Sequence, residues 1–117
     1  MMEEPLQWSV WLVDLDPVVG SEQSGRRPVA IVSREAANAV LPVVTAVPVT
    51  SRKAGRRIYP NEALIPAGAG GLSSESVAMA HQVRTVSKRH LAHRLGWMED
   101  SSIQEAIREA MRIQVDL

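Results

Sequence analysis

The stretch LPVVTAVPV, residues 41–49, decides the fold of this chain. Apolar and β-branched residues fill it almost without interruption, which is the composition of a buried strand. Pro48 lacks the N–H group that a strand donates to its neighbour, so this strand is expected to bend or to lie at a sheet edge there. The chain is therefore expected to be built around β-structure.

Two further strands are expected on the amino-terminal side of this stretch. Residues 7–15 are rich in aromatic and β-branched side chains, and Asp16-Pro17 ends the run with turn chemistry. Residues 28–33 form a short apolar run that begins with proline, at the position where a missing N–H costs least. Residues 34–40 predict either a single helical turn or a loop.

The β signals continue on the carboxyl-terminal side until a helix takes over. Residues 58–65 predict a strand, and the proline and glycines of residues 66–71 predict a turn. Residues 76–80 and 82–86 form either one bent strand or two short ones, with His81 at the junction. An amphipathic helix is expected from Ser102 to about residue 115, because apolar residues recur at helical spacing and Ser102 and Glu105 fit a capping box.

Short strands at close intervals favour a small barrel or a curled antiparallel sheet, with the terminal helix packed on it. The predicted fold class is therefore mainly β with α, an α+β arrangement. A chain of 117 residues without a repeat or a linker is expected to form one domain, residues 1–117.

Composition excludes several classes of function. Thirteen basic and thirteen acidic residues give a formal net charge of zero, which argues against bulk binding to nucleic acid but leaves room for a local basic patch. The absence of cysteine excludes disulfides, thiolate metal sites and a cysteine nucleophile. The amino terminus lacks the features of a signal peptide and no apolar run is long enough to span a bilayer, so a cytoplasmic protein without membrane contact is expected.

The polar run GSEQSGRRP, residues 20–28, is the first candidate site. Polar loops of this kind commonly do no more than connect strands, but an acid, an amide and two guanidiniums in one loop also suit a phosphodiester. Pro28 biases Arg27 toward an extended backbone, so Arg26 and Arg27 should point in roughly opposite directions. One guanidinium can then be held rigidly by the protein while the other stays free.

Three further groups of residues have open interpretations. The hydroxyls of Thr50 and Ser51 can bind a phosphate oxygen or stabilise a turn. The basic residues around Gly55 form a solvated loop or a surface for an anionic backbone. His81, in an apolar setting, is either a satisfied, partly buried histidine or a general acid or base.

Several motifs in order resemble the MazF/PemK/Kid family of toxin endoribonucleases. They are WLVDLDP at residues 11–17, GSEQSGRRPV at 20–29, LPVV at 41–44, VPVTS at 47–51 and HQVRT at 81–85. The resemblance covers about residues 8–95, and its Asp-Pro, Glu-Gln and Gly-x-Arg-Pro elements are fairly specific. Ser21, Met79 and His81 differ from the residues that some relatives carry there, which leaves the choice of acid and base open. The pair of Arg27 and Thr50 places the chain nearer the MazF branch than the Kid branch.

The resemblance implies a small SH3-like barrel with a carboxyl-terminal helix, the MazF/CcdB-like toxin fold, assembled as a two-fold homodimer. It also implies sequence-specific cleavage of single-stranded RNA, often mRNA, without a metal or another cofactor. A cognate antitoxin of a type II system, MazE-like and expected to be acidic and disordered when free, would inhibit the toxin.

By position, Arg27 and Thr50 match the catalytic arginine and threonine of the family. Attack of the RNA 2′-hydroxyl would give a 2′,3′-cyclic phosphate and a 5′-hydroxyl, and a permanently charged guanidinium can stabilise the phosphorane that forms on the way. Glu22 and His81 are both candidates for moving the proton. The expected RNA contacts are Ser21, Gln23, Ser51, Arg52, Lys53, Arg56, Arg57, Gln82 and Arg84.

Two alternatives share this fold. One is a toxin of the gyrase-poison type, which needs no groups that activate a phosphate. The other is a regulatory RNA-binding module, in which the basic residues contact RNA without cutting it.

Overall fold

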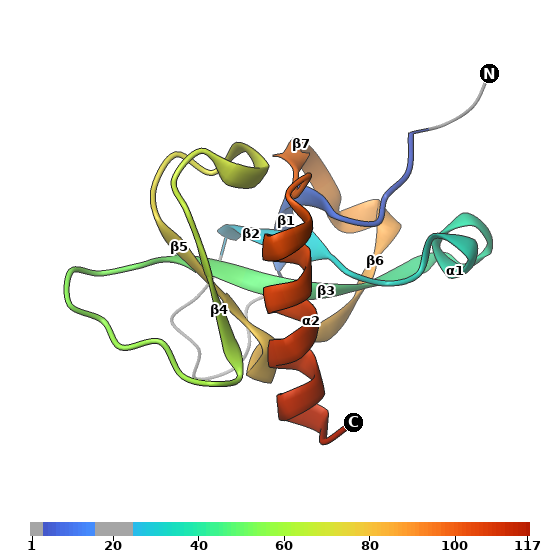
Figure 1. Ribbon diagram of the computed structural model, residues 1–117. Coiled ribbons are helices and arrows are strands. Elements are labelled where there is room, and N and C mark those ends of the chain that lie inside the picture. Colours follow the sequence, from blue (N-terminus) through green and yellow to red (C-terminus); the bar gives the residue numbers. More distant parts are fainter. Residues whose placement is uncertain (1–3, 16–24) are drawn as a thin grey trace.

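The computed structural model describes residues 4–15 and 25–117. In these residues one antiparallel sheet is covered by a carboxyl-terminal helix, α2 (Ser101–Val115), and this confirms the predicted fold class (Figure 1). The strands are β1 (Ser9–Leu15), β2 (Gly25–Ile31), β3 (Val43–Ser51), β4 (Glu62–Ile65), β5 (Ser76–Met79), β6 (Arg84–Ser87) and β7 (Leu91–Trp97). A short helix, α1 (Glu35–Val40), and three 3₁₀ turns, η1 (Ala69–Gly71), η2 (Ala80–Gln82) and η3 (Lys88–His90), complete the order.

The predicted central stretch is β3, and it pairs with three other strands. Its first half lies between β2 and β6, and from Val49 onward it pairs with β5. The change of partner follows Pro48, which is the last residue of β3 to pair with β2. Because β5, η2 and β6 follow one another along the same strand, the segment expected as one bent strand or two short ones is two strands joined by a 3₁₀ turn with His81 in its middle.

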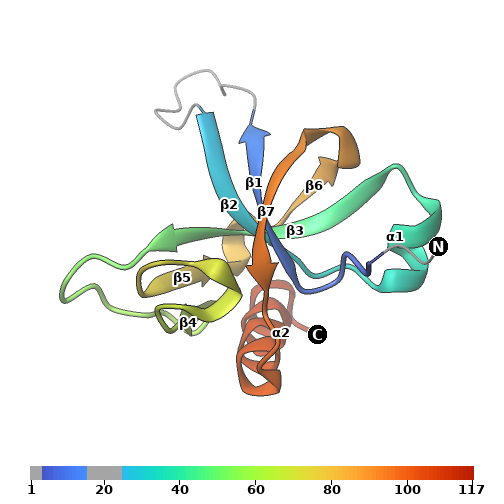
Figure 2. The same ribbon diagram turned by 90° about the horizontal axis from the view of Figure 1, so that it is seen from above.

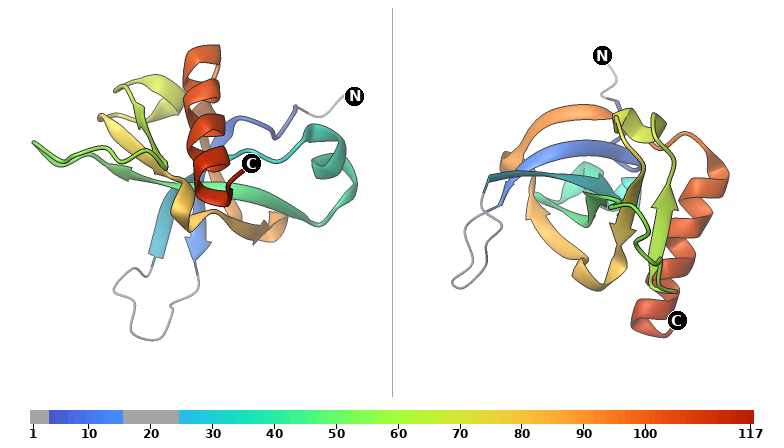
Figure 3. Two further views of the ribbon diagram at one scale, coloured as in Figure 1. Left: turned by 60° about the horizontal axis from the view of Figure 1, so that its bottom comes forward. Right: turned by 90° about the vertical axis from the view of Figure 1, so that its left-hand side faces the viewer.

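Side chains on both faces of the central strands are buried, which explains their nearly continuous apolar sequence. On β2, Val29 and Ile31 enter one core cluster, while Ala30 between them enters the other. The first cluster also contains Val13, Val44, Ala46 and Val86. The second is closed by Ile103, Ile107 and Ala110 of α2, which lies along β4 and η2 (Figure 3).

The helix begins one residue earlier than predicted, and Ser102 does not cap it. Asp100 is the cap: its carboxylate accepts hydrogen bonds from the Ser102 N–H, at 2.8 Å, and from the Ser102 hydroxyl, at 2.7 Å. Glu105, the expected partner in the capping box, pairs instead with Arg112 at 2.8 Å. The capping-box prediction is therefore wrong, because an aspartate upstream takes the acceptor role at the helix start.

Several strand bounds also differ from the predictions. β2 begins at Gly25 rather than Pro28, so Arg26 and Arg27 belong to a strand and not to the preceding loop. β4 is confined to Glu62–Ile65, the second half of the predicted range. β7 was not predicted at all, because its exposed basic residues and Gly96 hide the strand pattern.

The chain enters β1 through a strained turn at Trp8. The N–H of Ser9 donates to the carbonyl of Leu6 at 2.9 Å, and Trp8 adopts a φ of 70°, a value that favours glycine. The indole is 9% exposed and lies under the guanidinium of Arg108, 4.9 Å from the ring centroid. Burial of this side chain against α2 offsets the strain of the turn.

Within the part of the chain that the structure describes, neither α1 nor α2 combines the length and the apolar composition that a bilayer-spanning helix requires.

Candidate active site

Arg27 and Thr50 are brought together by the pairing of β2 with β3. The ladder ends at the pair of Val29 and Pro48, and two residues further along each strand lie Arg27 and Thr50. Side chains two residues apart in a strand share one face, so both point to the side that Val29 occupies. Two residues that are distant in the sequence therefore meet where the first core cluster ends.

These two side chains line a cavity of about 450 Å³ that is open to solvent. Gln82 and Arg84, both predicted to contact RNA, also line it. Two guanidiniums, two hydroxyls and an amide thus face one space, and no carboxylate of the described residues lines it. Such a set of donors is suited to binding and stabilising an anionic phosphate.

Arg26 and Arg27 separate as the alternation of a strand requires. The Nε atom of Arg26 lies 3.2 Å from an Asp14 carboxylate oxygen in an exposed ion pair. Arg27 instead lines the cavity and is partly buried. Only Arg27 of the two is placed to meet a ligand in the cavity.

Four residues that line the cavity were not singled out from the sequence: Pro48, Val49, Met79 and Thr85. Pro48 and Val49 directly precede Thr50, and Thr85 follows Arg84, so their places in the motifs could have indicated them. Met79 was noted only as a departure from some relatives, and a methionine in an apolar strand predicts core packing. Together Pro48, Val49 and Met79 give the cavity an apolar wall.

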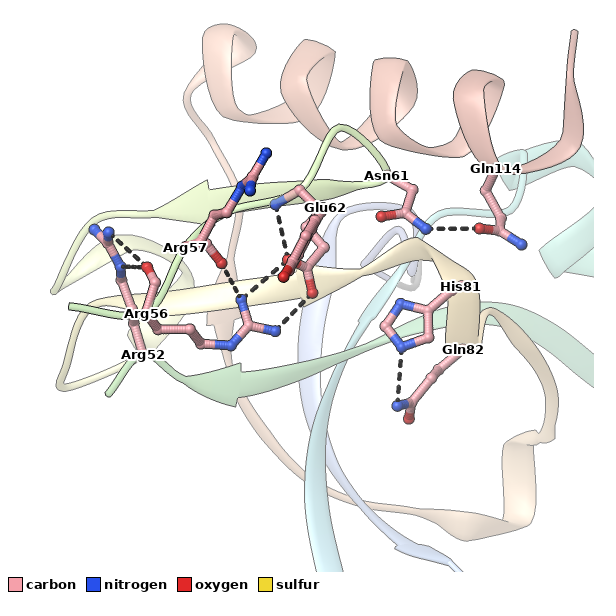
Figure 4. A network of polar contacts seen from close by, with 9 residues as sticks. Arg52, Arg56, Arg57, Asn61, Glu62, His81, Gln82 and Gln114 are labelled. Atoms are coloured by element: carbon pink, nitrogen blue, oxygen red, sulfur yellow. Dashed lines mark hydrogen bonds and ion pairs between the residues drawn. The ribbon is translucent and has the colours of Figure 1, made fainter. Parts of the chain in front are cut away.

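The basic residues after β3 divide into two pairs. Arg52 and Arg56 are engaged within the protein: the Arg52 guanidinium donates to the Arg56 carbonyl at 2.8 and 3.0 Å and to Glu75 at 3.1 Å (Figure 4). Lys53 and Arg57 are exposed, and the Arg57 guanidinium lies 5.1 Å from the centroid of the Tyr59 ring. None of the four lines the cavity of Arg27 and Thr50.

Arg56 closes this loop by a bidentate ion pair with Glu62, the first residue of β4. The two nitrogen–oxygen distances are 3.0 and 2.7 Å, and the Glu62 side chain is only 3% exposed (Figure 4). Its carboxylate also accepts from the Tyr59 N–H at 3.0 Å. The hydrogen bond from Arg56 lowers the pKa of Glu62 from its usual range, and the Tyr59 N–H adds to this effect while burial opposes it.

This pair predicts a loss of stability in acid that depends on Glu62. Because the pKa of Glu62 is lower in the folded than in the unfolded protein, the stabilisation is fully present above the unfolded value of about 4.3 and is lost as the pH falls through the folded value. The urea midpoint of the wild type should therefore fall in acid, and that of Glu62→Gln should fall less over the same range. Glu99→Gln, at an exposed carboxylate, should keep the full slope, whereas equal slopes for the wild type and Glu62→Gln would contradict the assignment.

His81 does not lie with Arg27 and Thr50. It is exposed and lines a second cavity, of about 720 Å³. The neighbouring residue, Gln82, lines the first cavity, and its amide nitrogen lies 3.3 Å from Nε2 of His81 (Figure 4). Arg27 and His81 therefore line different cavities.

The remaining candidates stay outside the cavity or outside the described residues. The Ser51 hydroxyl lies 3.2 Å from the hydroxyl of Ser74 and does not line the cavity. Ser21, Glu22 and Gln23 lie outside the residues that the structure describes.

The fold and the cavity define a class of protein: a small antiparallel β-sheet with a terminal helix, carrying a cationic site suited to phosphate. A family model described as PemK-like, MazF-like toxin of type II toxin-antitoxin system matches residues 6–115. Endoribonuclease MazF9 of Mycobacterium tuberculosis is 35% identical over 113 residues, which cover 92% of this chain and 93% of that protein. Endoribonuclease MazF of Staphylococcus saprophyticus is 34% identical over 108 residues, 92% of this chain and 88% of that protein.

Solved structures agree with the sequence relatives. An endoribonuclease in complex with its cognate antitoxin, from a mycobacterial species, superposes with a TM-score of 0.79 at 26% identity and covers 97% of each chain. MazF from Deinococcus radiodurans superposes with a TM-score of 0.74 at 30% identity, again over 97% of each chain. This chain belongs to the PemK/MazF family of toxins of type II toxin–antitoxin systems.

Proposed function

We propose that this chain is an endoribonuclease toxin that cleaves single-stranded RNA, such as mRNA, at short sequence motifs and without a metal ion. The observation that carries the proposal is the meeting of Arg27 and Thr50 in one cavity whose described lining residues include a second arginine and no carboxylate. A divalent cation is usually held by carboxylate oxygens, whereas this lining offers cations and neutral donors. In this proposal the RNA 2′-hydroxyl and the side chains supply the chemistry.

In the proposed reaction the RNA 2′-oxygen attacks the adjacent phosphorus while its proton passes to a base. The phosphorus–O5′ bond breaks, the 5′-oxygen gains a proton, and the products carry a 2′,3′-cyclic phosphate and a 5′-hydroxyl. The phosphorane between these steps carries additional negative charge. Arg27 would donate to its non-bridging oxygens, and the Thr50 hydroxyl would add a further donor to the same group.

Of the two candidates for proton transfer, we favour Glu22. His81 lies in the other cavity and contacts the one around Arg27 only through Gln82. Glu22 lies in the sequence five residues before Arg27, in the motif that the family shares, and its carboxylate has the chemistry of a general base.

The same proposal extends to the assembly of the protein. We expect residues 1–117 to act as one domain, to form a two-fold homodimer and to be inhibited by a cognate antitoxin, as the mycobacterial relative is solved with its own. An acidic antitoxin segment would cover the guanidiniums of Arg27 and Arg84. Because mRNA is the proposed substrate, we place the protein in the cytoplasm.

The direct test is cleavage of a long RNA by purified protein in excess chelator. We expect discrete fragments at unchanged rate when the chelator is added, because no step needs a metal. An all-DNA copy should stay intact, because it lacks the 2′-hydroxyl. Loss of cleavage in chelator would overturn the metal-free chemistry, and stable RNA binding without any product would indicate a binding module instead.

A further inference from the structure

The 3₁₀ turn η2 contributes a residue to each of the two cavities. Gln82 lines the cavity of Arg27 and Thr50, while His81, one residue earlier, lines the cavity beside α2. Figure 4 shows the two side chains next to each other. Figure 2 shows α2 beside β4 and β5, and α2 contacts both β4 and η2. A side chain in one cavity is thus in contact with a side chain in the other.

The contact between His81 and Gln82 defines a protonation state. The two atoms 3.3 Å apart are Nε2 of the imidazole and the amide nitrogen of Gln82. An amide nitrogen only donates hydrogen bonds, so a hydrogen bond between these two atoms requires an unprotonated Nε2 as acceptor, which is the Nδ1–H form of the neutral imidazole. The opposite end of the same amide group, its carbonyl oxygen, is then turned away from His81.

Protonation of the imidazole reverses this arrangement. Both ring nitrogens of a charged histidine are donors, so Nε2 can no longer accept from the amide nitrogen. Rotation of the amide by half a turn restores the contact, because the carbonyl oxygen then accepts from Nε2–H. The end of the amide that is turned away from His81 becomes the NH₂ group.

We propose that His81 is a positioning residue that sets, by its protonation state, which end of the Gln82 amide is presented to RNA in the cavity. Neutral His81 leaves the Gln82 oxygen free to accept, and charged His81 leaves the NH₂ group free to donate. This inference rests on the proposed function, because it takes the cavity of Arg27 and Thr50 as the RNA site. It gives His81 a role in recognition instead of in proton transfer.

Few charged groups among the described residues line the two cavities that His81 and Gln82 face. The charged residues that line its cavity among the described residues are Arg56 and Glu62, and they are paired with each other at 2.7 Å. Tyr59 is the other titratable group there, and α2 contributes the neutral side chains of Ile113 and Gln114. On the side of Gln82, the charged residues that line the cavity are Arg27 and Arg84.

The two states of Gln82 favour different bases. A carbonyl oxygen accepts from the exocyclic amines of adenine, cytosine and guanine, whereas an NH₂ group donates to carbonyl oxygens such as those of uracil. Exchange of one hydrogen bond changes the preference for a base by about two- to ten-fold. The base preference at one position beside the cut should therefore depend on pH.

The first test uses the full-length protein without RNA. In ¹⁵N-labelled wild type, the side-chain NH₂ resonances of Gln82 should shift with the same midpoint as the ring resonances of His81. In His81→Phe they should not move over that range, and in the control His90→Phe, at an exposed histidine outside η2, they should titrate as in the wild type. Gln82 resonances that ignore the His81 titration would overturn the proposal, whether or not the protein cuts RNA.

The second test measures cleavage of an RNA pool randomised at the nucleotides that flank a mapped cut site. The ratio of cleavage rates between bases is compared at pH 5.5 and pH 8, so that any general effect of pH on the chemistry cancels. The wild type should change its preference at one position by about two- to ten-fold, and His81→Phe should not change it. A preference that is independent of pH in the wild type, with cleavage otherwise intact, would overturn the inference and leave the proposed function standing.

Discussion

Replacing Arg27 with alanine is expected to lower the rate of RNA cleavage by about a hundred-fold or more, because preorganised donors of this kind contribute on the order of 3 kcal/mol each to the transition state. Arg27 is partly buried and lines the cavity with Thr50. Its proposed role is to stabilise the phosphorane more strongly than the ground state. The loss should therefore fall on the rate at saturating RNA. Single-turnover cleavage of a short RNA with one mapped site measures it.

Arg26→Ala is the matched control for this substitution. Arg26 is the preceding residue of β2 and carries the same charge, but it is exposed and pairs with Asp14 across β1. Exposed ion pairs contribute little to stability, and this one lies outside the cavity. Arg26→Ala should therefore keep near-normal cleavage. If both variants lost activity equally, general electrostatic attraction of RNA by positive charge would explain the effect, and Arg27 would have no special role.

Gly71→Ala is expected to prevent folding. Gly71 has a φ of 77°, and a Cβ atom there would lie 2.0 Å from the carbonyl oxygen of Leu95 in β7. That oxygen belongs to the backbone, so the contact cannot be relieved by rotating a side chain. Far-ultraviolet and near-ultraviolet circular dichroism, with urea unfolding, should show a chain that lacks the cooperative transition of the wild type.

Gly68→Ala separates the effect of contact from that of backbone strain. Gly68 has a φ of 91° in the same turn region, but a Cβ atom there would have no neighbour within 4 Å. This variant should fold and lose only about 1 to 2 kcal/mol, the cost of a left-handed conformation for a residue with a Cβ atom. A Gly71→Ala protein as stable as Gly68→Ala would show that η1 does not pack on β7 as described.

The strands that are buried on both faces were the predictable part of the fold. Residues 44–49 and 29–32 are mostly apolar because many of their side chains enter one core cluster or the other, and that pattern is visible without a structure. β7 was missed because it pairs with one strand only, β1, and keeps basic residues such as His93 and Arg94 exposed. A half-exposed strand at a sheet edge has a weaker pattern than a buried one.

The local predictions that were wrong or missing concern positions at which an unexpected residue makes the contact. Ser102 has the sequence signature of a helix cap, but Asp100 lies close enough to accept its N–H and its hydroxyl. Trp8 occupies a turn position that favours glycine, which no propensity would predict, because its burial against α2 depends on the tertiary fold.

The candidate site was predictable in its centre and not at its edges. Motif order indicated Arg27 and Thr50, and the pairing of β2 with β3 explains why residues so far apart in the sequence meet. Arg52 and Arg56 look like free cations in the sequence, but the carbonyl of Arg56 and the carboxylates of Glu75 and Glu62 engage them. His81 and Gln82 are adjacent in the sequence, yet their side chains line different cavities.

The central claim is that the RNA supplies its own nucleophile in a site where Arg27 stabilises the phosphorane. The most direct test is cleavage of an RNA that carries one 2′-deoxy substitution on the nucleotide before a mapped cut. The account predicts that the modified bond resists the protein while the other sites of the same RNA are cut at their usual rate. Cleavage of the 2′-deoxy bond at the rate of the unmodified one would contradict the account.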